Sequence, residues 1–65
     1  MWKDAIKEPP INDDEVIAIW IGWDDMICMR TLSYDPPFKE WCDWNGEDYN
    51  DILMWIPLPE ALKNL

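Results

Sequence analysis

The sequence predicts a small, mainly β domain: a three- to four-stranded antiparallel meander with short helical turns at one or both ends. One observation is the near-continuous run of β-branched and aromatic residues at 16–23, which favours a strand over a helix. A second is that polar, acidic or proline-containing turn segments separate several short extended stretches. The third is length, because 65 residues form a single domain, 1–65, with no room for another.

The first residues are expected to form no more than a short helical turn. Residues 2–8 are compatible with a helix, which Pro9 and Pro10 end because proline disfavours helix at the residue before it. Residues 12–15, Asn-Asp-Asp-Glu, are then expected to form a turn that leads into the first strand.

The second strand, residues 26–33, is expected to pair with the first through a tight loop at Asp24–Asp25. In this register Ile21 lies opposite Cys28. Asp-Asp is not a favoured two-residue turn, so a bulge or a wider loop at Gly22 stays open as an alternative. The first strand is apolar on both faces, so it is either central and covered on both sides or meets a partner chain on one side.

Two further strands complete the predicted meander. Residues 38–44 form a third short strand, and residues 45–51 form a polar, acidic loop. Residues 52–56 form the last strand, which a Pro-Leu-Pro segment ends. Residues 60–65 are expected to fold back on the sheet as a helical turn.

The chain is strongly acidic, with 14 Asp and Glu against five Lys and Arg and a formal net charge of −9. Such a field repels nucleic acid and anionic membranes and attracts basic protein surfaces. Phosphate binding needs clustered cations, and the cations here are scattered along the chain: Lys3, Lys7, Arg30, Lys39 and Lys63. The apolar run at 16–23 is far shorter than a membrane span. We therefore expect no direct binding to nucleic acid or membrane.

The composition gives little support for catalysis or metal binding. The chain has no histidine, which excludes Ser–His and Cys–His nucleophile pairs. Cys28 and Cys42 match no zinc spacing, and the acidic run at 43–51 lacks the glycine and glutamate positions of a calcium loop. The prediction is a non-enzymatic protein without metal or cofactor.

The two cysteines also bear on the expected location of the protein. A bridge between Cys28 and Cys42 stays open. The sequence starts with polar residues and shows no signal peptide, so the expectation is a cytoplasmic protein with both thiols reduced.

Exposed aromatic and acidic side chains are the candidate binding residues. Tryptophans are enriched at the centres of protein interfaces, and carboxylates at turns can steer a basic partner. The candidate contact residues are Trp20, Trp23, Trp41 and Trp44. The candidate steering residues are Asp13, Asp14, Asp24, Asp25, Glu47 and Asp48. The alternative is that the tryptophans are core residues and the carboxylates keep the surface soluble.

The ends of the chain resemble a small phage and prophage family of unknown function. Trp2 and Pro10 match its opening, and the segment Trp55-Ile-Pro-Leu-Pro matches its ending. Members of that family open with Trp-Ile-Ser-Val, carry a Leu-Pro and a Val-Leu-Val strand, and end on Thr-His-Trp-Met-Pro-Leu-Pro. The family's Thr-His is Leu53-Met54 here, and the excess of acid and tryptophan is not part of its pattern. The resemblance implies a common origin and a shared scaffold.

A phage origin suggests a function for a short, acidic, non-catalytic chain. The leading hypothesis is a phage accessory protein, in the host cell cytoplasm, that binds and inhibits a basic host protein. The target would be a nucleic-acid-binding defence component, as for anti-CRISPR proteins and nucleic-acid mimics. Two alternatives remain: a homo-oligomeric sponge for a small signalling nucleotide, held by Arg30 and the lysines against Trp faces, and a minor structural adaptor of a phage assembly.

Overall fold

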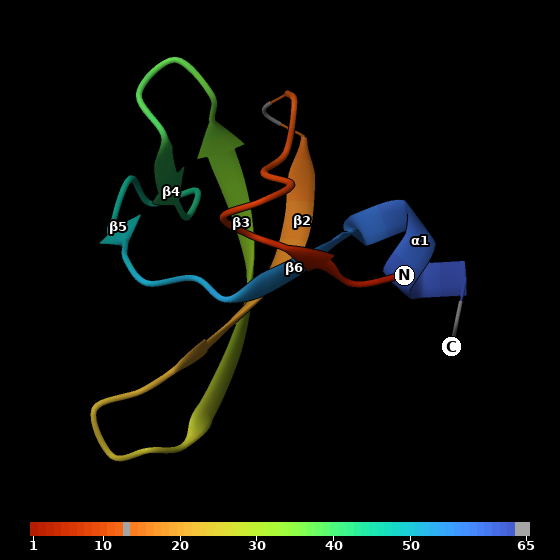
Figure 1. Ribbon diagram of the computed structural model, residues 1–65. Helices are drawn as coiled ribbons and strands as arrows, with labels where there is room; N and C mark the ends of the chain where they lie inside the picture. The colour runs from red at the N-terminus through yellow and green to blue at the C-terminus, as the bar shows by residue number, and fades with distance from the viewer. Residues whose placement is uncertain (13, 64–65) are drawn as a thin grey trace.

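The computed structural model describes residues 1–12 and 14–63 (Figure 1). These residues form one mainly β domain with a single short helix, which confirms the predicted fold class. The elements are β1 (Lys3–Asp4), β2 (Glu15–Ile21), β3 (Ile27–Asp35), β4 (Glu40–Cys42), β5 (Asp48–Tyr49), β6 (Met54–Pro57) and α1 (Leu58–Lys63). β1 and β5 were not predicted, because a two-residue strand is too short to show a periodic pattern.

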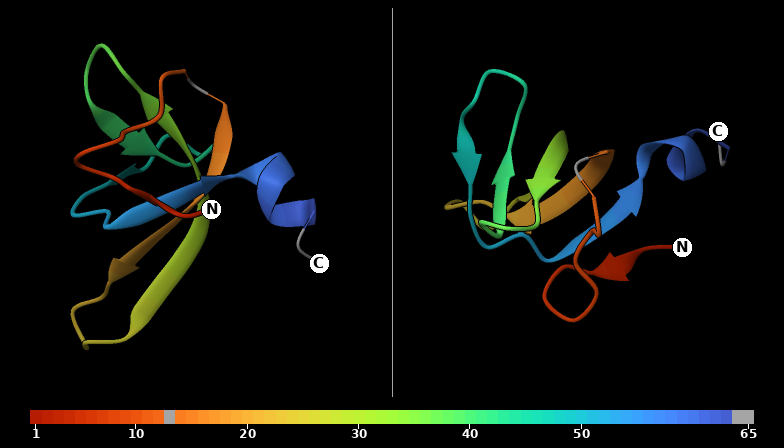
Figure 2. Two further views of the ribbon diagram at one scale, coloured as in Figure 1. Left: turned by 45° about the vertical axis from the view of Figure 1, so that its right-hand side comes forward. Right: turned by 90° about the horizontal axis from the view of Figure 1, so that it is seen from above.

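All six described strands belong to one antiparallel sheet with the order β1-β6-β2-β3-β4-β5. The chain runs from β2 to β5 as a meander and then returns, so that β6 pairs with the other edge of β2. β1 pairs outside β6, and α1 packs against β2 and β6. The sheet is strongly twisted, and the N-terminus lies beside α1 (Figures 1 and 2). The N-terminal ammonium group forms an ion pair with Glu60 of this helix.

The core lies on one face of the sheet. Val16 and Ala18 of β2 are buried there, and Leu32 of β3 is only 1% exposed. Trp55 of β6 is also buried, and its indole N–H donates a hydrogen bond to the backbone carbonyl of Glu8 at 2.7 Å. The contiguous core consists of Ala5, Val16, Ala18, Leu32, Tyr34, Trp41, Ile52 and Trp55. Trp55, one of the residues that carry the family resemblance, therefore acts as scaffold.

The hairpin of β2 and β3 shows that the predicted register is wrong by one residue. Ile21 pairs with Ile27, not with Cys28. The connection is a wider loop from Gly22 to Met26, in which the Gly22 N–H donates to the Met26 carbonyl at 2.8 Å. Asp25 takes a positive φ of 61° in this loop. The alternative of a wider loop at Gly22 is thus the observed one.

Several predicted boundaries also change. The expected helical segment 2–8 is a short strand followed by one turn, closed by a hydrogen bond from the Glu8 N–H to the Asp4 carbonyl at 2.9 Å. β4 covers only Glu40–Cys42 of the predicted 38–44. The last strand begins at Met54 instead of Ile52, and Ile52 is buried in the core ahead of the strand.

Candidate functional site

The four candidate tryptophans have different environments. Trp41 is 8% exposed and belongs to the core, where its ring lies 4.6 Å from that of Tyr34. Trp20 is half-buried, packs against the core and lies 5.3 Å from the Tyr49 ring. In contrast, Trp23 is 99% exposed and Trp44 is 91% exposed. The candidate contact surface on the described chain therefore reduces to Trp23 and Trp44.

Trp44 lies in the loop between β4 and β5, which we call the Trp44 loop (residues 43–47). The preceding residue, Asp43, is buried, and one oxygen of its carboxylate accepts backbone N–H bonds from Asn45 at 2.9 Å and Glu47 at 3.0 Å. The Asp43 N–H donates to the Glu47 carbonyl at 3.0 Å. Gly46 takes a φ of 83°, which favours glycine. These contacts fix the loop and leave the Trp44 indole in solvent.

The second oxygen of Asp43 is also held. It accepts a hydrogen bond from the Tyr49 hydroxyl at 3.0 Å and lies 3.9 Å from a guanidinium nitrogen of Arg30. Hydrogen bonding by the Glu47 N–H lowers the pKa of Asp43, with further contributions from Tyr49, Asn45 and Arg30, against the opposing effect of burial. Burial and the bond to Asp43 raise the pKa of Tyr49. Asp43 is therefore an ionised anchor for the loop.

Trp23 lies in the loop between β2 and β3, which we call the Trp23 loop (residues 22–26). The Asp24 carboxylate accepts the Met26 N–H at 3.2 Å, and the Asp25 N–H donates to the Gly22 carbonyl at 3.0 Å. A Cβ on Gly22 would lie 3.0 Å from the Cys28 sulfur, so the backbone approaches closely here. The loop is closed by its own hydrogen bonds, and its indole projects into solvent.

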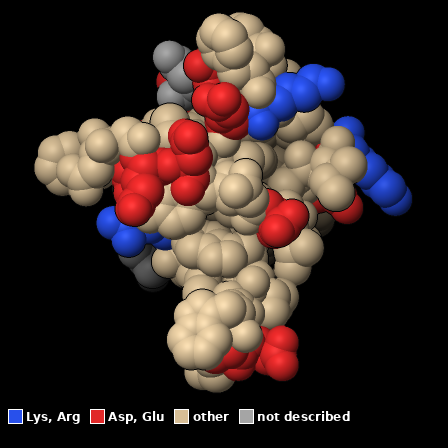
Figure 3. Space-filling model, turned by 90° about the vertical axis from the view of Figure 1, so that its left-hand side faces the viewer, with Lys and Arg blue, Asp and Glu red and all other residues tan. Residues whose placement is uncertain are grey.

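The candidate acidic residues are exposed but do not form one patch. This holds for Asp14, Asp24, Asp25, Glu47 and Asp48, whereas Asp13 lies outside the described residues. Figure 3 shows carboxylates in separate clusters on one face, divided by uncharged surface. The Trp23 loop and the Trp44 loop also lie apart in both views of Figure 2. The arrangement is two separate indoles, each beside its own carboxylates.

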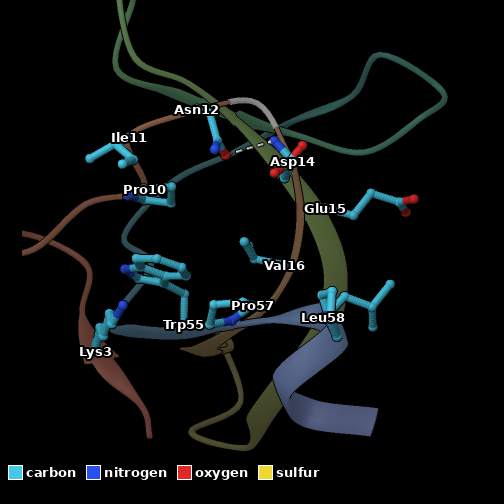
Figure 4. Close-up of a pocket in the computed structure, with 11 residues that line it drawn as sticks. Lys3, Pro10, Ile11, Asn12, Asp14, Glu15, Val16, Trp55, Pro57 and Leu58 are labelled. Carbon is cyan, nitrogen blue, oxygen red and sulfur yellow. Dashed lines mark hydrogen bonds between the residues drawn. The ribbon is translucent and has the colours of Figure 1, made fainter.

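A groove between the N-terminal segment and β6 was not predicted as a site. It has a volume of about 570 Å³, and Pro10, Trp55 and Pro57 form its apolar wall (Figure 4). The Lys3 ammonium lies 5.1 Å from the centre of the Trp55 ring. Asp14 and Glu15 line the same groove, so its local charge is not basic. The sequence feature that could have indicated this groove is the pattern of Pro10 and Trp55-Ile-Pro-Leu-Pro, which the family resemblance assigns to a shared scaffold.

Other chemistry is sparse in the described part of the chain. Residues 1–12 and 14–63 contain no group of three or more side chains that could hold a metal ion. Cys28 and Cys42 are both free thiols, and burial, with nearby carboxylates, raises the pKa of Cys42. No helix in these residues is long and apolar enough to cross a membrane.

Comparison with protein-family models, with curated proteins and with solved structures finds no match to this chain. The resemblance to the phage and prophage family therefore stays a prediction from the terminal motifs. The functional argument rests on the geometry of the two loops.

Proposed function

We propose that this chain is a non-catalytic protein that binds a basic surface of another protein through Trp44 and Trp23. The observation that carries the proposal is the almost complete exposure of both indoles on loops held by their own hydrogen bonds. Tryptophan is the side chain most enriched among interface hot spots. A loop that is already ordered loses little conformational entropy on binding.

The charge of the molecule supports a basic partner. Asp24 and Asp25 follow Trp23 directly, and Glu47 and Asp48 lie shortly after Trp44. Carboxylates around an aromatic anchor complement a cationic surface and raise the association rate. The net charge of −9 acts over the whole approach of the two proteins.

The narrower proposal is that the protein is a phage accessory inhibitor of a host nucleic-acid-binding defence component. Two facts support it: the resemblance at Trp2, Pro10 and Trp55-Ile-Pro-Leu-Pro, and an acidity suited to a groove that otherwise holds nucleic acid. The nucleotide-sponge alternative has weaker support, because Arg30 already lies near Asp43 and 5.9 Å from the Tyr49 ring centre. Lys3 shares its groove with Asp14 and Glu15.

Affinity capture tests the proposal. The tagged protein is immobilised, incubated with bacterial lysate at low salt and eluted with a salt gradient, and the eluate is identified by mass spectrometry. The expected result is one stoichiometric nucleic-acid-binding protein that moderate salt releases and that Trp44→Ser captures poorly. A hot-spot loss of about 2 kcal/mol weakens Kd roughly 30-fold.

The matched control is Phe38→Ser, which removes an aromatic ring that is 71% exposed in the loop between β3 and β4. This variant should capture the same protein as the wild type. Capture that Trp44→Ser and Trp23→Ser leave unchanged would contradict the proposed site.

A further inference from the structure

One edge of β3 is open along most of its length. β3 pairs with β2 from Ile27 to Ser33, but it pairs with β4 only at Ser33–Asp35. Among the described residues, the outer edge of β3 from Ile27 to Leu32 therefore has no strand partner. Figure 1 shows the same feature, since the β2–β3 hairpin extends beyond the rest of the sheet. An open edge presents unpaired backbone N–H and carbonyl groups to another strand.

The side chains on this hairpin are apolar and exposed. Ile27 is 71% exposed and Met29 is 60% exposed, and Ile21 lies opposite Ile27 and is also exposed. A two-stranded ribbon is marginally stable in water without a covering layer. Pairing with another chain would satisfy the unpaired backbone groups of the β3 edge. It would also bury these apolar side chains.

The charge distribution favours a second copy of this chain over a basic partner at this edge. The β3 segment from Ile27 to Ser33 contains none of the 14 acidic residues and one cation, Arg30. This edge lacks the carboxylates that lie beside Trp23 and Trp44, so it offers little attraction to a cationic protein. It is also the region through which two copies can approach with the least repulsion.

We infer that two copies pair β3 to β3 in antiparallel orientation, with Met29 on the two-fold axis. In an antiparallel pair, directly opposite residues share a face of the sheet. When the two-fold axis is perpendicular to the sheet, opposite residues share a face only if one residue lies opposite its own copy. Met29 then faces Met29, and Ile27 faces Thr31 on the same face of the sheet.

The neighbouring pairing registers of the two β3 strands are less favourable. An axis at Arg30 places two guanidinium groups directly opposite each other, which is destabilising. An axis at Thr31 brings Met29 opposite Ser33, where β4 already occupies the edge. An axis at Cys28 leaves only Ile27–Met29 to pair, because β3 begins at Ile27.

The chosen register also fits the neighbouring surface. It places Ile27 of one copy opposite Thr31 of the other, next to the hollow that Thr31, Ser33 and Trp44 line. An apolar side chain thus approaches a hollow whose lining includes Trp44.

The mass in solution is the first test, measured by light scattering over a range of concentrations. We expect twice the chain mass of 7.8 kDa for the wild type, falling to the single-chain mass on dilution. Ile27→Glu should be monomeric with an unchanged circular dichroism spectrum, since Ile27 is exposed within each copy. Phe38→Glu, at an equally exposed position, should remain dimeric.

Cross-linking tests the register. In a background of Cys28→Ser and Cys42→Ser, Met29→Cys should form an intermolecular disulfide on mild oxidation, because opposite Cα atoms lie about 4.5–5.5 Å apart. Thr31→Cys should not, because its opposite residue is Ile27. A monomeric wild type at every concentration, or equal cross-linking by Thr31→Cys, would overturn the inference.

The outcome is separate from that of the proposed function. A monomeric protein that loses partner capture in Ile27→Glu would mean that the edge binds the partner, not a second copy. A dimer that captures nothing would leave the pairing established and refute the proposed function instead.

Discussion

At the scale of single residues, Asp43 is the side chain that most directly positions the candidate site. Its carboxylate holds two backbone N–H groups of the Trp44 loop, the Tyr49 hydroxyl and a nearby Arg30. Sequence alone does not distinguish Asp43 from the thirteen other acidic residues, because its role depends on burial directly after β4. Trp44, the residue directly after this anchor, is almost fully exposed.

Asp43→Asn should destabilise the protein at neutral pH, because an amide replaces the ionised acceptor of these bonds. The pKa of Asp43 is lowered in the folded chain, so its contribution to stability is present above the unfolded pKa, about 3.9 for Asp, and is lost as the pH falls through the folded value. In urea unfolding, the difference in the free energy of unfolding between wild type and variant should therefore be large at pH 7 and become smaller in strong acid.

Asp48→Asn is the matched control, since it removes the same charge from an exposed position. It should leave the urea midpoint nearly unchanged at pH 7. Equal effects of the two substitutions would show that net charge, and not the Asp43 contacts, governs stability.

At the scale of elements, the sheet separates buried from exposed positions by simple alternation. The predicted strand 38–44 is too long, because Trp41 is buried within β4 whereas Trp44 lies exposed in the loop that follows it. The sequence could not decide which face of β2 is the core, since Val16 and Ile17 are both apolar. The register was wrong because the wider loop depends on a positive φ at Asp25, which no hydrophobic pattern encodes.

Leu32→Ala should be among the most damaging core substitutions. Leu32 is almost fully buried in β3, and removal of a buried leucine side chain costs about 2–5 kcal/mol. A chain of this length has a total stability of roughly 3–10 kcal/mol at about 0.05–0.15 kcal/mol per residue. Thermal unfolding should show a partly or fully unfolded variant.

Ile6→Ala provides the comparison for Leu32→Ala, because Ile6 lies exposed in the turn after β1. Its effect should stay within about 0.5 kcal/mol. Similar losses for the two variants would contradict the assignment of the core to the face that carries Leu32.

At the scale of the whole molecule, charge and apolar surface occupy different regions. Carboxylates cluster at the loops, whereas the outer edge of β3 from Ile27 to Leu32 carries no carboxylate and, among the described residues, has no strand partner. The acidity and the scattered positions of the cations can be seen in the sequence. The separation in space of the two exposed tryptophans cannot be predicted from it. That separation depends on how far β2 and β3 extend past their neighbours, which is a property of the complete sheet.

Salt should weaken partner binding through the association rate. Between about 0.1 M and about 1 M salt, the Debye length falls from about 10 Å to about 3 Å, which screens the field of the −9 chain. Surface plasmon resonance should show a steep fall in the association rate constant and a smaller change in the dissociation rate constant. A rate constant that is flat across this range would remove the electrostatic part of the proposal.

The most direct test of the central claim is the Kd of the captured partner for wild type, the double variant Trp23→Ser, Trp44→Ser, and Phe38→Ser. If the two loop indoles are the anchors, the double variant should bind at least about 30-fold more weakly, and Phe38→Ser should match the wild type. If the double variant binds as tightly as the wild type, the partner contacts another surface and the proposed function of these loops is wrong.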